Sequence, residues 1–127
     1  MHLRVARPAT DPERCAAMYC KGLGFVVRSR FVDHDGFDGV MVGDLAAGYH
    51  FEFVRSRMHP VAPTPTVEDL LVFYVPDAQE WQRRCDAMSA AGFATVDSFS
   101  PYWAARGRTF VDVDGYRTVI QRASWPA

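Results

Sequence analysis

The residues best suited to chemistry in this sequence are His50 and Glu52, which lie two positions apart in the run 49–54. The run has the pattern of a strand, and side chains two positions apart on a strand share one face. An imidazole can transfer protons near neutral pH, and a carboxylate can act as a general base or bind a metal ion. Both residues are therefore candidates for catalysis, while the ordinary interpretation of His50 is a partly exposed strand residue.

The cysteines do not indicate a catalytic thiol. Cys15, Cys20 and Cys85 form no Cys-x-x-Cys pair, and their odd number does not suit a disulfide framework. A reactive cysteine needs a base close by, and no histidine stands near Cys15 or Cys20 in the sequence. We expect free thiols on buried helix faces.

The bulk properties favour an ordinary globular protein. The chain has 127 residues, a formal net charge of -1 and a pI near 6.4, so it lacks the basic excess of a nucleic-acid binder. No stretch approaches the roughly 18 to 20 apolar residues of a membrane span, and residues 1–7 are typical of a short strand rather than a signal peptide. We expect one cytoplasmic domain with neither a nucleic-acid nor a membrane partner.

The first half of the chain, residues 1–55, is predicted to form a βαβββ module. Asp11 is a helix N-cap, Pro12 suits the first helical turn, and Gly24 follows the end of the helix. The expected elements are a helix over about 12–21 and strands at 2–8, 25–32, 39–43 and 49–54.

Residues 56–67 contain three prolines and little periodicity, which indicates a linker. A second βαβββ module is predicted over 68–127. Its elements are a helix over 78–90, strands at 70–75, 93–97, 107–112 and 116–121, and a loop that contains Pro101, Tyr102 and Trp103.

The two modules repeat each other at a nearly constant distance, which indicates an internal duplication. The matching landmarks are Asp11 and Asp77, Gly24-Phe25 and Gly92-Phe93, and Gly48-Tyr49 and Gly115-Tyr116, at offsets of 66, 68 and 67. The sequence therefore predicts an α+β domain, 1–127, built from two tandem units.

The chain resembles the vicinal oxygen chelate superfamily. The resemblance rests on this duplication and on two motifs, Gly-Leu-Gly-Phe at 22–25 and Asp-Val-Asp-Gly-Tyr-Arg at 112–117. That superfamily includes glyoxalase I, fosfomycin-resistance enzymes, extradiol dioxygenases, methylmalonyl-CoA epimerase and bleomycin-resistance proteins. The resemblance covers nearly the whole chain. It implies a glyoxalase-like fold, in which two curled mixed sheets surround a central pocket with helices outside, and a homodimer.

The resemblance also implies where a divalent metal would bind in the enzymes of the superfamily. The corresponding positions in this chain are Arg4, Glu52, Leu70 and Val119. Only Glu52 has an atom that can ligate a metal, so we predict no metal and no other cofactor. A shift of two residues along each strand leaves an alternative divalent-metal site, which consists of His2, His50, Glu52 and Glu68.

In the implied pocket, Arg4 and Glu52 face the same interior and can form an ion pair. The pair is either purely structural or an anchor for a ligand that carries an anion or a carbonyl group. The other predicted ligand-binding residues are His50, Leu70, Val72, Tyr74, Tyr102, Trp103 and Val119. Arg106 and Arg108 are expected to be solvated, or else to contact an anionic ligand.

The sequence thus predicts a metal-independent protein that binds a small molecule, of the glyoxalase and bleomycin-resistance type. Two alternatives stay open. One is a lyase, isomerase or dioxygenase-type enzyme, with a non-standard metal site or with His50 or Glu52 as general base. The other is a module that acts through its dimer surface.

Overall fold

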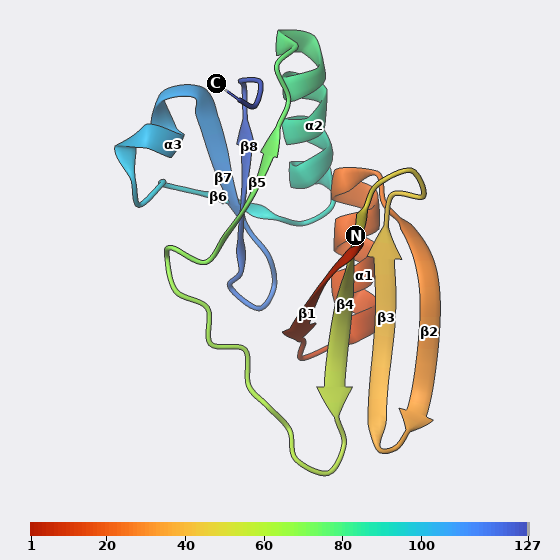
Figure 1. The fold of residues 1–127 in the computed structure, drawn as a ribbon. Helices are drawn as coiled ribbons and strands as arrows, with labels where there is room; N and C mark the ends of the chain where they lie inside the picture. The colour runs from red at the N-terminus through yellow and green to blue at the C-terminus, as the bar shows by residue number, and fades with distance from the viewer. Residues whose placement is uncertain (127) are drawn as a thin grey trace. The chain divides into compact units, whose positions relative to one another are not determined.

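A computed structural model describes residues 1–126, and the chain divides into two compact units (Figure 1). The first unit is Met1–Pro63, and the second begins at Thr64. Each unit holds one four-stranded mixed sheet, which confirms the predicted α+β class and the tandem modules. No helix within residues 1–126 is both long enough and apolar enough to cross a membrane.

The first unit follows the predicted βαβββ order. Its elements are β1 (Leu3–Pro8), α1 (Pro12–Leu23), β2 (Val26–His34), β3 (Phe37–Gly43) and β4 (Tyr49–Ser56). The sheet order is β1-β4-β3-β2, in which β1 runs parallel to β4 and the other neighbours are antiparallel. The first and last strands of the unit therefore lie side by side (Figure 1).

Local signals set the ends of α1. The side chain of Asp11 accepts a hydrogen bond from the backbone N–H of Arg14, which satisfies a donor that the first helical turn leaves unpaired. Gly24 ends the helix in the left-handed conformation, with φ of 72°, which a residue without a Cβ adopts at little cost. The apolar face of α1 includes Tyr19, whose ring lies 4.9 Å from that of Phe53 on β4.

The core of the first unit fills the space between α1 and one face of the sheet. Along β3 and β4 every second residue is buried on this face. The buried residues of this core include Cys15, Met18, Tyr19, Val40, Val42, Phe51 and Phe53. The alternate residues of the same strands consequently point away from α1, on the sheet face that this helix leaves free.

The second unit repeats the arrangement after a segment, 57–69, that contains no helix or strand. Its elements are β5 (Leu70–Tyr74), α2 (Ala78–Ala90), β6 (Ala94–Val96), α3 (Pro101–Arg106), β7 (Gly107–Val111) and β8 (Arg117–Gln121). The sheet order is β5-β8-β7-β6, with β5 parallel to β8. Asp77 caps α2 as Asp11 caps α1, because its side chain accepts from the backbone N–H of Glu80.

The short helix α3 corrects the predicted loop around Pro101. Ser100 accepts a hydrogen bond from the backbone N–H of Tyr102, and Pro101 occupies the first helical turn, where it loses no intrahelical bond. A helix of six residues has too few turns to produce a periodic pattern, which is why the sequence indicated a loop. α3 contacts β7 and β8.

The two helices of the second unit contact opposite faces of its sheet. Trp81 of α2 donates its indole N–H to the carbonyl of Ile120, and its ring contacts the guanidinium of Arg108, which shares a sheet face with Ile120. On the other face, which Gly107 and Gln121 share, the carbonyl oxygen of Trp103 in α3 lies close to Gly107. Residues of the unit itself thus contact both faces of this sheet.

Candidate functional site

The polar side chains predicted for the site come together on the free sheet face of the first unit. In the parallel pairing of β1 with β4, Arg4 lies opposite His50, and Glu52 is two positions further along β4 on the same face. On the other side of β4, Met41 of β3 lies opposite Glu52. With His2, which precedes β1, these residues form what we call the Arg4 cluster: His2, Arg4, Met41, His50 and Glu52.

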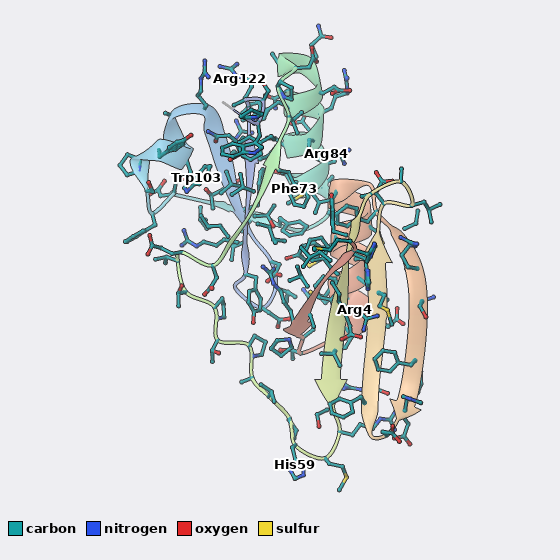
Figure 2. The ribbon with its side chains drawn as sticks, viewed as in Figure 1. Arg4, His59, Phe73, Arg84, Trp103 and Arg122 are labelled. Atoms are coloured by element: carbon teal, nitrogen blue, oxygen red, sulfur yellow. The ribbon has the colours of Figure 1, made fainter. Side chains whose placement is uncertain are left out.

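Arg4, which Figure 2 labels in the first unit, contacts three other members of this cluster. Its Nε donates to Nε2 of His50 at 2.9 Å, one terminal nitrogen lies 3.4 Å from a carboxylate oxygen of Glu52, and the other lies 3.3 Å from the sulfur of Met41. The ion pair between Arg4 and Glu52 that the sequence predicted is present. Three side chains thus hold one guanidinium in a defined position.

The contact with Arg4 fixes the tautomer of His50. A guanidinium can only donate, so Nε2 of His50 must accept and the neutral ring carries its proton on Nδ1. This Nδ1 lies 2.7 Å from Nε2 of His2, and it is therefore the donor of that hydrogen bond. The order of donation runs from Arg4 to His50 to His2.

The surroundings of His50 keep it neutral. Burial lowers the pKa of its imidazole, and the nearby charges of Arg4, His2 and Arg28 lower it further, against a smaller opposite effect of Glu52. A lowered pKa agrees with the tautomer, since a protonated ring cannot accept the hydrogen bond from Arg4. His50 is consequently uncharged at neutral pH.

The cluster is open to a ligand on one side. The side chain of Arg4 is 48% exposed, whereas that of Glu52 is 13% exposed. Glu52 uses one carboxylate oxygen toward Arg4, and its other oxygen has no hydrogen-bond partner among residues 1–126. The arrangement therefore presents a guanidinium that can donate and a carboxylate oxygen that can accept.

This set of side chains does not fit a divalent metal ion. Of the four positions that the superfamily resemblance assigns to ligands, three hold Arg4, Leu70 and Val119, which have no ligating atom. The two atoms best able to ligate, Nε2 of His50 and a carboxylate oxygen of Glu52, both contact the cationic guanidinium of Arg4. A second cation at this place would meet direct charge repulsion.

No group of three or more His, Cys, Asp or Glu side chains suited to a metal occurs within the described part of the chain. His2, His50 and Glu52, three of the residues in the alternative metal site, belong to the Arg4 cluster of the first unit. Glu68, the fourth, belongs to the second unit, where it lines a hollow with Leu70 and Trp103.

The predicted apolar residues of the second unit share one face of its sheet. Leu70, Val72 and Tyr74 alternate along β5, and Val72 lies opposite Val119 of β8. Val119 has no exposed surface. Beside this face lies a hollow of about 20 Å³, which is room for little more than one water molecule. Leu70, Val72 and Tyr74 are half-buried, and the hollow beside them leaves little room for a ligand.

The predicted aromatic residues Tyr102 and Trp103 both lie on α3, and Figure 2 labels Trp103. Trp103 lines the small hollow together with Leu70 and Thr109, whereas Tyr102 is 54% exposed. Trp103 thus helps to fill the sheet face of the second unit.

Sequence reasoning missed two contacts of the Arg4 cluster. Met41 gave no chemical signal, although its alternation with the buried Val40 and Val42 places it on the polar face. The bond between His2 and His50 depends on the pairing register of β1 with β4, which the hydrophobic pattern of a short terminal strand does not determine.

Two family descriptions match the two halves of the chain. Residues 3–54 match the YycE-like N-terminal domain, and residues 68–122 match the YycE-like C-terminal domain. YycE of Bacillus subtilis (strain 168), an uncharacterized protein, is 37% identical over 121 residues, which are 95% of this chain and 87% of YycE. The match with the YycE crystal structure covers 97% of this chain and 90% of the YycE chain, with a TM-score of 0.88 and 36% identity.

More distant structures share the fold. The fosfomycin resistance protein FosX from Mesorhizobium loti matches with a TM-score of 0.74 and 10% identity, covering 99% of this chain and 92% of FosX. TnmS3, an antibiotic-binding protein from Streptomyces sp. CB03234, matches with a TM-score of 0.64 and 18% identity, covering 98% of this chain and 96% of TnmS3. The chain belongs to the YycE-like family, and its fold is that of the vicinal oxygen chelate superfamily.

Proposed function

We propose that this protein binds a small amphipathic molecule without a metal ion, and that Arg4 provides the positive charge of the site. The observation that carries the proposal is the position of the guanidinium, which three side chains hold on the free sheet face of the first unit. A metal in such a site would attract an electron-rich oxygen of the ligand. Arg4 attracts the same kind of group by charge and by hydrogen bonds.

The Arg4 cluster suits a ligand whose polar end carries a carboxylate or a carbonyl. The half-exposed guanidinium of Arg4 can donate to an oxygen in the plane of its fork. A ligand N–H or O–H can in turn donate to the carboxylate oxygen of Glu52 that has no partner among residues 1–126. Together the two groups would orient the polar end.

An apolar hollow beside the cluster supports an amphipathic ligand. Ala6 and Val54 follow Arg4 and Glu52 by two residues on their strands, so they continue the same sheet face. Both line a hollow of about 210 Å³ in the first unit, together with Arg7, Pro8, Phe37, Ser56 and Val61. A ligand with its polar end at Arg4 can bury an apolar body in this hollow.

The hydrogen bonds favour binding over catalysis by His50. A general base needs an unoccupied lone pair within reach of the substrate. In His50, Nε2 accepts from Arg4 and Nδ1 carries the proton toward His2, so neither nitrogen is available without breaking the cluster.

Binding without catalysis has a parallel among the structures that share this fold, since TnmS3 is an antibiotic-binding protein. We further propose, as the resemblance implied, that the protein is a homodimer.

The test uses the full chain after dialysis against a chelator, with benzoate as the probe. Benzoate pairs a carboxylate with a flat apolar ring, and amide shifts in a ¹H–¹⁵N spectrum report where it binds. We expect saturable shifts at His50, Glu52 and Val54, and binding at least about ten-fold weaker in R4Q, since charge-assisted hydrogen bonds are lost.

The control is R14Q, which removes one exposed arginine of α1 and should bind benzoate as the wild type does. The proposal fails if benzoate produces no saturable shift in the first unit. It also fails if R4Q binds benzoate as tightly as R14Q does.

A further inference from the structure

The second unit has a hollow with two arginines in its wall, in a part of the chain that the proposed function does not use. Its volume is about 190 Å³. The lining residues are Trp81, Ala104, Ala105, Arg106, Gly107 and Arg122. They come from α2, from α3, from the start of β7 and from Arg122, which directly follows β8 and is labelled in Figure 2. No acidic residue contributes to this wall.

The sheet pairing forces the two arginines of the wall together. The backbone N–H of Arg122 donates to the carbonyl of Arg106 at 2.7 Å, directly after the last strand pair, Gly107 with Gln121. Like charges on directly opposed residues destabilise a sheet. Neither arginine forms an ion pair with any residue of the described range 1–126. Within residues 1–126, no acidic partner offsets the repulsion between these two arginines.

The ring of Trp81 contacts two guanidinium groups, that of Arg122 from the wall of the hollow and that of Arg108 from β7. The guanidinium carbon of Arg108 lies 5.0 Å from the centroid of the Trp81 ring, and that of Arg122 lies 5.9 Å from it. The ring is held in place because its N–H donates to the carbonyl of Ile120 at 2.8 Å. Aromatic faces attract cations, so Trp81 gathers positive charge at this hollow.

The acidic residues of α2 are directed to other contacts. Asp86 accepts a hydrogen bond from Gln82 at 2.9 Å, on its own helix. Glu80 lines a different hollow with Arg83 and Arg84. The Trp81 hollow is therefore a place of concentrated positive charge with an aromatic wall.

We propose that the Trp81 hollow binds a phosphate group, either of inorganic phosphate or of a small phosphate ester. The planar fork of a guanidinium matches the oxygens of a phosphate. A dianion can neutralise both Arg106 and Arg122, whereas a carboxylate carries only one charge. The volume of 190 Å³ is below the roughly 300 Å³ of the smallest pockets for drug-sized ligands, so the hollow suits a compact group. This proposal is independent of the Arg4 cluster.

The probe is inorganic phosphate, titrated into the full chain at constant ionic strength set with chloride. The readout is the indole N–H signal of Trp81 in a ¹H–¹⁵N spectrum, assigned with a W81F variant. We expect a saturable shift of this signal, with binding weakened about ten-fold or more in R106Q and in R122Q. R14Q, with the same loss of charge on α1, should bind phosphate as the wild type does.

Acetate and phenyl phosphate complete the design. Acetate should bind far more weakly than phosphate, because one negative charge leaves part of the arginine repulsion in place. Phenyl phosphate that binds tighter than inorganic phosphate would assign the site to an ester, and weaker binding would assign it to free phosphate. The proposal is overturned if phosphate gives no saturable shift, if acetate binds equally well, or if R122Q matches R14Q while its spectrum is that of a folded protein.

Discussion

Replacing Gly107 with alanine tests whether α3 lies against the sheet of the second unit as the structure shows. The backbone of Gly107 is extended, with φ of −134° and ψ of 174°, so an alanine can adopt it without strain. A methyl group there would meet the side-chain oxygen of Gln121 and would lie 2.7 Å from the carbonyl oxygen of Trp103. Gln121 is only 3% exposed, so its side chain has little room to move away.

The expected loss follows from these contacts. Overpacking of this kind costs about 1–3 kcal/mol, and the lower entropy of the unfolded alanine chain returns about 0.4–1 kcal/mol. The two ranges combine to a net loss of about 0–2.6 kcal/mol. Because one of the close atoms is a backbone oxygen, which cannot rotate away, we expect G107A to lose about 1–2 kcal/mol of unfolding free energy, measured by urea denaturation. The control is G48A, where the nearest atom beyond the chain neighbours is the Met1 carbonyl oxygen at 3.8 Å, and where we expect no loss. Equal stability of G107A and the wild type would refute the placement of α3.

Three further predictions concern protonation and reactivity. Because the pKa of His50 is lowered in the native protein, the unfolded chain binds a proton more readily than the native protein does as the pH drops below about 6.5. The free energy of unfolding should therefore fall in this range, by at most about 1.4 kcal/mol per pH unit. The difference in this free energy between wild type and H50Q, from urea curves at pH 5 to 8, should shrink toward low pH. Asp38 accepts hydrogen bonds from Arg57, and these hold the pKa of its carboxyl well below its usual range. The charged carboxylate of Asp38 therefore stabilises the native protein at neutral pH, and this stabilisation is lost in acid. D38N should therefore lower the Tm at pH 7 more than at pH 3, and an equal effect at both values would show that the ion pair is not responsible. Burial raises the pKa of the Cys85 thiol, so a thiol reagent should label at most the half-buried Cys20 in the native protein and all three cysteines after unfolding.

The fold could be read from the sequence where local signals carried it. Asp11 and Asp77 each accept a hydrogen bond from the backbone N–H three residues further along the chain. Because this contact is local, sequence spacing reveals both caps. The helix α3 was missed because its six residues give no periodicity, although Ser100 followed by Pro101 is a helix-start signal that could have indicated it. Element boundaries also shifted, since β2 continues to His34, two residues beyond its predicted end.

The site could be predicted only in part. The pair of Arg4 and Glu52 followed from placing the first and last strands of the module side by side. The bond from His50 to His2 and the contact with Met41 depend on exact register, which sequence patterns do not supply. The hollow at Trp81 unites parts of the second unit up to about 40 residues apart in the sequence. Of its two arginines, sequence patterns singled out only Arg106, as either solvated or in contact with an anionic ligand, and they gave no signal for Arg122.

Arg4, and not a metal ion, is the proposed source of positive charge at the site of the first unit. The most direct test is thermal unfolding of chelator-treated protein during titration with Mn²⁺, Ni²⁺, Zn²⁺ and Fe²⁺, because an ion that binds the native state must raise the Tm. We predict no saturable rise with any of the four ions. A rise that saturates near one equivalent and disappears in E52A would contradict the account and identify a metal site at Glu52.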